Sequence, residues 1–205
     1  QHNPYPTLQD SANELWVFID EDARGVQPGQ ALSSDSPITA GMKEVLAIVS
    51  GAVSARSDAT LRHTPLLSTG EISGMVPGAK LRDIMQGTTN VAREAKGLKP
   101  FIPIAMSIEG TPKPASAAGS DPSPAASGEI RAVYISDADM MLPQFSMIRA
   151  DPNTITEARF QFQNVTFVLN CIDWLTGETD FIEVRKHEPI FASLRMIDSV
   201  KELAM

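Results

Sequence analysis

Cysteine is almost absent from this chain of 205 residues, in which Cys171 is the only one. A single cysteine excludes an intramolecular disulfide, and it excludes the metal sites that need several thiolates. The three histidines, His2, His63 and His187, lie far apart, and none has a partner at the spacing of metal ligands. We therefore expect no metal centre and no cofactor.

Long apolar runs and an excess of positive charge are also missing. The longest apolar segment, residues 165–175, is interrupted by Asn170 and Asp173 and is shorter than the roughly 20 residues that cross a bilayer. The chain has 17 basic and 25 acidic residues, which gives a formal net charge of −8. This balance disfavours binding to phosphate backbones, so nucleic acid is not an expected partner.

Two motifs of common enzyme classes are absent. The chain has neither the glycine-rich phosphate loop of ATPases nor the Gly-x-Ser-x-Gly elbow that presents a serine nucleophile. Cys171 lies in the middle of an apolar segment, where we expect it to be a small buried side chain. We therefore predict a domain without catalytic activity.

The composition is that of a globular protein, with 42% hydrophobic and 20% charged residues. The length suits one medium-sized domain, which we assign to residues 1–188. Within it, residues 110–128 are mostly Gly, Pro, Ala, Ser and Thr, so we expect a flexible loop without core contacts. Residues 189–205 carry apolar side chains at spacings of three and four, which predicts a C-terminal helix.

Compact apolar segments bounded by polar clusters predict the strands. These segments are residues 14–20, 101–108, 129–136 and 180–185. Strands that alternate with helices and turns favour an α/β fold, with an open, largely parallel sheet and flanking helices.

The apolar period becomes helical after residue 163. The side chains of Val165, Val168, Leu169, Ile172 and Leu175 fall at helical spacing, and Gly177 stands where a C-terminal cap belongs. We therefore predict a helix over residues 164–176 that packs on one face of the sheet.

The main candidate for chemistry is the pair Asp137 and Asp139, which follows the predicted strand 129–136. Ligands of open α/β sheets bind at the carboxyl ends of strands, so the pair suggests a metal-dependent hydrolase as an alternative function. The motif resembles that of haloacid-dehalogenase phosphatases only in part, because Met140 follows it in place of Thr or Val. In the favoured interpretation the aspartates cap the following turn.

A second alternative is a domain that binds a small ligand such as a sugar or a peptide. Such a site would need a concave surface lined by aromatic side chains. Two tryptophans and two tyrosines in the whole chain give this alternative little support.

Three short patterns occur in order along the chain. Residues 36–41 read SPITAG, and residues 64–69 read TPLLST. Later, an Asn-x-x-aromatic-x-x-Asn-x-x-x-Trp-Leu pattern begins at Asn164 and is followed by Val184-Arg185. Asn164 is expected to cap the start of the helix that carries this pattern.

These patterns, together with Asp137 at a strand end, resemble the GldG-type family, the auxiliary component of ABC transport systems related to gliding motility. The resemblance covers residues 35–188 and implies a flavodoxin-like fold related to class I glutamine amidotransferases. Nothing matches the catalytic Cys–His pair of that fold, so the resemblance implies a binding or assembly domain. Asp137, Asp139 and Asn164 are its candidate ligand or partner residues.

The resemblance also implies a cellular context. Members of this family lie on the extracytoplasmic, periplasmic side, are anchored to the inner membrane, and work with an ABC permease and an ATPase. Because the chain begins with Gln1, we expect the membrane segments to lie outside this fragment. The helix 189–205 then either folds back onto the sheet, or begins a stalk or a homo-oligomer contact.

Overall fold

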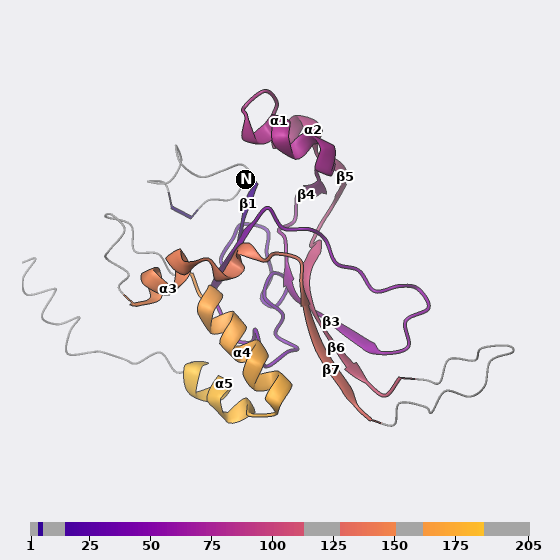
Figure 1. Cartoon of the computed structure of the whole chain (residues 1–205), viewed down its shortest axis with the longest axis vertical. Helices are drawn as coiled ribbons and strands as arrows, with labels where there is room; N and C mark the ends of the chain where they lie inside the picture. The colour runs from indigo at the N-terminus through magenta and orange to yellow at the C-terminus, as the bar shows by residue number, and fades with distance from the viewer. Residues whose placement is uncertain (1–3, 6–14, 113–127, 151–161, 187–205) are drawn as a thin grey trace, which may run out of the picture.

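The computed structural model describes residues 4–5, 15–112, 128–150 and 162–186, without the side chains of residues 148–150. Within these ranges the chain forms three small sheets with a layer of helices beside them (Figure 1). None of the described helices is long and apolar enough to cross a membrane. The predicted helix 189–205 lies outside the described residues, as does most of the predicted loop 110–128.

All three sheets are antiparallel: β1 pairs with β2, β3-β6-β7 form the second sheet, and β4 pairs with β5. The strands are β1 (Trp16–Asp20), β2 (Glu44–Ile48), β3 (Arg62–Ser68), β4 (Ser73–Met75), β5 (Lys96–Lys99), β6 (Pro103–Gly110) and β7 (Ile130–Ile135). The predicted strands 14–20, 101–108 and 129–136 are therefore confirmed as β1, β6 and β7.

The prediction of an open, largely parallel sheet is wrong, and with it the relation to flavodoxin-like folds. A parallel pair needs a crossover of a dozen or more residues, usually a helix. The helices that separate strands here are α1 (Leu81–Met85) and α2 (Val91–Glu94), which are too short to cover a sheet. Strands β6 and β7 pair as a hairpin instead, with Gly110 opposite Ile130.

The predicted helix 164–176 is confirmed as α4 (Asn164–Thr176). It ends at Gly177, whose φ of 85° lies in the left-handed region that glycine adopts without strain. The N–H of Glu178 donates to the carbonyl of Asp173 at 2.8 Å, a bond from the second residue past the helix that closes its last turn.

The predicted strand 180–185 is wrong, because these residues form helix α5 (Thr179–Lys186). A short apolar segment fits both a strand and a helix, so its period does not decide between them. The charges do favour a helix: Asp180 lies in the first turn and Arg185 in the last, where each complements the helix dipole. Only Ile182 of α5 is buried.

The main core joins both larger sheets to the two helices. From α4, the buried side chains Phe167, Cys171 and Trp174 enter this core, and Ile182 enters it from α5. The strand side chains on the other side include Ile19, Val45, Ala47, Leu66, Leu67, Ile104 and Ala105. This packing fixes the position of α4 relative to β2.

A second, mainly aromatic cluster covers the opposite face of β1 and β2. Phe18 and Leu46 face Tyr5 and Phe145 there. The ring of Phe162 lies 5.1 Å from that of Tyr5 in an edge-to-face arrangement. Because Phe162 lies two residues before the start of α4, this cluster also holds the start of that helix.

The connection between β6 and β7 is expected to be dispensable. Deletion of residues 113–127 leaves Thr111, Pro112, Gly128 and Glu129 to join Gly110 to Ile130, which already face each other across the hairpin. A four-residue hairpin loop is common, and shortening a loop has a small entropic effect. We expect the free energy of unfolding, measured in urea, to be unchanged or to rise by up to about 1.5 kcal/mol. A clear loss would show that the deleted residues contribute to packing.

Candidate functional site

Asp137, the first of the predicted site residues, follows β7 and is buried. Its carboxylate accepts hydrogen bonds from the N–H of Ile48 at 2.5 Å and from the N–H of Asp139 at 2.8 Å. Burial raises the pKa of Asp137 above its ordinary value, against the lowering effect of these bonds. Both carboxylate oxygens therefore have structural partners.

Asp139 begins the short 3-10 helix η3 (Asp139–Met141) and is exposed. The bond from its N–H to Asp137 closes a local turn through the Asp137 side chain, whereas the N-cap of η3 is Ala138, which makes no side-chain capping bond. Among the residues that the structure describes, no group of three or more His, Cys, Asp or Glu could hold a metal ion. The arrangement of the two aspartates thus lends the hydrolase alternative no support.

Asn164 is completely buried, and its side chain contacts strand β2. Its Oδ1 accepts from the N–H of Leu46 at 3.0 Å, while its Nδ2 donates to the carbonyl of Leu46 at 2.7 Å and to that of Met140 at 3.2 Å. The side-chain amide thus pairs with Leu46 as a neighbouring strand would. The expectation that Asn164 caps α4 is wrong, because the N-cap is Gln163, and it makes no side-chain capping bond.

The structure brings Asp137 and Asn164 together along one edge of β2, where they join Gln163. The N–H of Gln163 donates to the carbonyl of Glu44 at 2.9 Å, Asn164 pairs with Leu46, and Asp137 accepts from Ile48. Alternate residues of an antiparallel strand direct their backbone N–H and C=O groups to opposite sides. Gln163, Asn164 and Asp137 therefore provide hydrogen-bond partners for the backbone groups on the side of β2 that faces away from β1. An uncovered edge would leave unpaired backbone groups.

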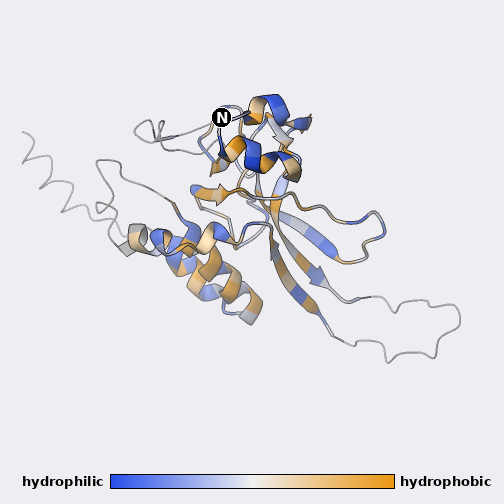
Figure 2. Cartoon of the chain, turned by 45° about the horizontal axis from the view of Figure 1, so that its top comes forward, coloured by the Kyte–Doolittle hydropathy of each residue, from blue (hydrophilic) through white to orange (hydrophobic). Residues whose placement is uncertain are grey.

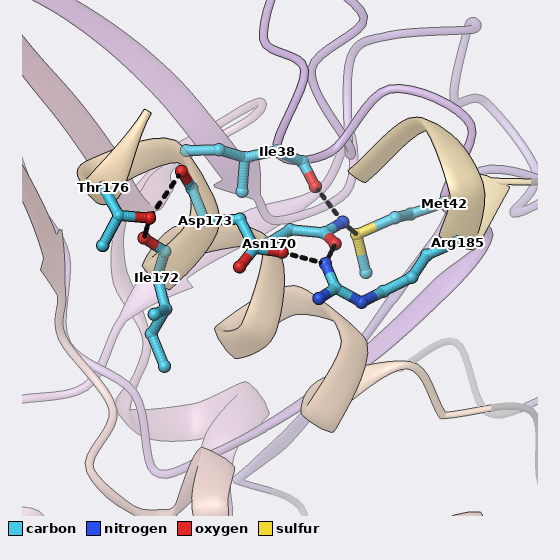
Figure 3. Close-up of polar contacts among 7 residues, drawn as sticks. All are labelled: Ile38, Met42, Asn170, Ile172, Asp173, Thr176 and Arg185. Carbon is cyan, nitrogen blue, oxygen red and sulfur yellow. Dashed lines mark hydrogen bonds and ion pairs between the residues drawn. The ribbon is translucent and has the colours of Figure 1, made fainter. Parts of the chain in front are cut away.

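A polar network links α4 to α5 and to the turn at residues 36–41 (Figure 3). Nδ2 of the buried Asn170 donates to the carbonyl of Ile38 at 2.9 Å. Its Oδ1 accepts from Nη1 of Arg185 at 2.9 Å, and the same nitrogen lies 2.5 Å from Oδ2 of Asp173. Because both partners of Arg185 are on α4, the network fixes the guanidinium beside that helix.

Next to this network lies a cavity of about 250 Å³, which we call the basic pocket. It is lined by Gly41, Met42, Lys43, Gln163, Thr166, Asn170, Arg185 and Lys186. Three of these side chains are cationic and none is acidic, in a chain whose net charge is −8. Such a lining attracts an anionic group.

The cations of the basic pocket differ in how far they are neutralised. Arg185 is paired with Asp173, and Lys186 lies 2.6 Å from Glu183. Lys43 is exposed and forms no ion pair with any residue in the described ranges. Lys43 is therefore the cation most available to an incoming anion.

Sequence reasoning missed the basic pocket, since neither Lys43 nor Lys186 stood out from the pattern of charges. A signal was nevertheless present in the motifs. The SPITAG turn supplies Ile38 and Gly41, the helix pattern supplies Asn170, and the Val-Arg ending supplies Arg185. Motifs more than a hundred residues apart thus meet at this one place.

Two other titratable groups are notable for their burial. Burial raises the pKa of Glu44 to about 7, with a further contribution from the charge of Asp20, although a hydrogen bond from Tyr5 at 2.7 Å opposes the shift. Burial also raises the pKa of the Cys171 thiol to about 12, so this group is not a thiolate nucleophile at neutral pH.

Comparison with known proteins gives one match. A family model described as an ABC-type uncharacterized transport system, auxiliary component, matches residues 5–171. The matched residues include all seven described strands and the first half of α4, and they end before α5. No curated protein and no solved structure matches the chain.

Proposed function

The chain belongs to this family of auxiliary components of ABC-type transport systems, and from that membership we propose that it is a non-catalytic binding and assembly domain of such a system. We place it on the extracytoplasmic side, where it would contact the permease and, through the assembled complex, the ATPase. The relation to gliding-motility systems of the GldG type is part of the same proposal.

The observation that carries the binding role is the basic pocket. Three cationic side chains converge on a cavity of about 250 Å³, and Asn170 and Asp173 hold Arg185 in place. A guanidinium fixed by the protein loses little side-chain entropy when it binds a carboxylate or a phosphate. We therefore propose that the pocket receives an anionic group presented by another component of the transport system.

The alternatives find less support in the geometry. The carboxylate of Asp137, on which a hydrolase would depend, is engaged by two backbone N–H groups. A site for a sugar or a peptide would need a concave surface lined by aromatic side chains, and the lining of the basic pocket contains none. The predicted homo-oligomer contact concerns residues 189–205, outside the described ranges, and stays a prediction.

The assembly role is tested in native membranes with the full-length protein. We expect it to co-purify with the permease and the ATPase of its transport system, and to be digested by protease added to spheroplasts but not to intact cells. Failure of wild-type protein to co-purify would contradict the assembly role. Protection from protease in spheroplasts would contradict the extracytoplasmic location.

The basic pocket is tested in the same assay by charge reversal. Because the double variant Lys43→Glu, Lys186→Glu places two carboxylates at the pocket, we expect it to retain less than about a tenth of the permease that wild type retains. Arg24→Glu is the matched control, since Arg24 is exposed and lies outside the pocket. Equal retention by both variants would show that assembly does not use the pocket.

A further inference from the structure

Residues 71–100 form an excursion from the second sheet. They leave after β3 and return before β6, and the backbone closes behind them, because the N–H of Phe101 donates to the carbonyl of Gly70 at 3.1 Å. The excursion consists of β4, the 3-10 helix η2 (Gly78–Lys80), α1, α2 and β5. In Figure 1 it lies apart from the two larger sheets, at the top of the view.

The excursion contributes almost nothing to the core. Its single buried side chain is that of Ile84. Four of its large apolar side chains are exposed, most of all Ile72 at 87% and Leu98 at 69%, followed by Met85 and Met75. Exposed aliphatic side chains gathered on one element indicate a surface that another body covers.

The two most exposed of these side chains belong to the two sides of the β4–β5 pair. Ile72 lies in the bend directly before β4, and Leu98 lies on β5. A methyl group at Gly74 would lie only 2.8 Å from Cδ2 of Leu98, so Leu98 covers Gly74. Both exposed aliphatic side chains thus belong to this one strand pair and the bend that leads into it.

The charge of the excursion is opposite to that of the rest of the chain. It contains five basic and three acidic side chains, whereas the remaining residues contain 12 basic and 22 acidic ones. Lys80 pairs with Asp83 at 3.2 Å. The other cations, Arg82, Arg93, Lys96 and Lys99, are exposed and form no ion pair with described residues.

Aliphatic side chains surrounded by unpaired cations are the combination that binds an anionic membrane surface. The aliphatic groups enter the boundary between headgroups and acyl chains, while lysine and arginine are attracted to anionic headgroups. Figure 2 shows strongly hydrophilic and hydrophobic residues side by side on the short helices of the excursion, at the top of the view.

We propose that the excursion of residues 71–100 is a membrane-surface contact that recognises anionic phospholipid. Ile72 and Leu98 enter the headgroup boundary, and Lys96 and Lys99, on the same strand as Leu98, contact the lipid phosphates. This contact orients the domain on the bilayer that holds its transporter. It does not depend on the proposed function of the basic pocket.

The proposal is tested by sedimentation of the 205-residue chain with vesicles, which contain no transporter. We expect binding to vesicles of equal parts phosphatidylglycerol and phosphatidylcholine that weakens with salt, and little binding to phosphatidylcholine alone. Two double variants are compared with wild type: Ile72→Ser with Leu98→Ser, and Lys96→Glu with Lys99→Glu. Each is expected to bind the anionic vesicles at least about tenfold more weakly than wild type. Since all four side chains are exposed, we expect both variants to keep the wild-type circular dichroism spectrum.

The matched control is the double variant Ile172→Ser, Leu175→Ser, which removes two half-exposed apolar side chains from α4, outside the excursion. It is expected to bind vesicles as wild type does. The proposal is overturned if wild type binds neither vesicle, if binding shows no preference for anionic lipid, or if the control weakens binding as much as the excursion variants. Capture of a protein partner through Ile72 and Leu98, without vesicle binding, would also overturn it.

Discussion

Replacement of Asn164 by leucine is expected to lower the free energy of unfolding by roughly 4 kcal/mol. Leucine branches at the same position as asparagine and is larger, but it cannot pair with the backbone of Leu46 or with the carbonyl of Met140, which Asn164 contacts at 2.7 to 3.2 Å. Each buried backbone group that loses its partner costs about 1 to 3 kcal/mol. The loss is measured by urea unfolding, as a lower midpoint concentration with the same dependence of the free energy of unfolding on urea concentration.

Asn90→Leu is the matched control for this substitution. Asn90 is exposed and accepts from the N–H of Arg93, at 2.9 Å, as the N-cap of α2. Loss of such a cap costs about 1 kcal/mol. If Asn164→Leu were no more destabilising than Asn90→Leu, the edge of β2 would not depend on the Asn164 amide.

Stability is expected to fall as pH rises from about 4.5 to about 7, because of Glu44. Burial raises the pKa of Glu44 to about 7 from the 4.5 of an unperturbed side chain, so between these values the folded protein holds a proton that the unfolded chain has released. Protons bound preferentially by the folded state make stability decrease with pH. At pH 8 the folded state carries the full penalty of a buried charge, roughly 3 kcal/mol.

The variant Glu44→Gln isolates this contribution, because its side chain stays neutral and can still accept from the Tyr5 hydroxyl, which lies 2.7 Å from Oε2 in wild type. We expect it to be more stable than wild type at pH 8 by roughly 3 kcal/mol, and about equally stable at pH 4.5. Thermal or urea unfolding across this range would measure the difference. Glu71→Gln, at an exposed position, should follow the wild-type curve. A constant difference between Glu44→Gln and wild type at all pH values would contradict the assignment.

Much of the local structure and the family could be predicted from the sequence. Apolar segments with polar boundaries predicted β1, β6 and β7, since burying such a segment is the main way it gains free energy. The helical period after residue 163 and Gly177 at its end predicted both bounds of α4. The order of three short motifs predicted a transport auxiliary component, which the match over residues 5–171 supports.

The pairing of the strands and the role of the buried polar residues were decided by tertiary structure. An apolar segment does not say which strand it will pair with or in which direction, because both pairings bury the same side chains. The apolar period of residues 180–185 fits a strand and a helix equally well, so the sequence did not decide between them. In the structure these residues follow directly on the turn that closes α4, and they form helix α5.

Asp137 and Asn164 were predicted as candidate ligand residues, and the structure places them on an edge of β2 that lies 89 and 118 residues away from them in sequence. Lys43 and Arg185 meet in the basic pocket across a similar separation. A polar side chain can bind a ligand or satisfy a buried backbone group with the same atoms, and which of the two it does depends on what the fold places within about 3 Å of it. The sequence determined most of the elements and their chemistry, and only the packing of α4 against β2 and α5 determined which polar groups were left to bind something else.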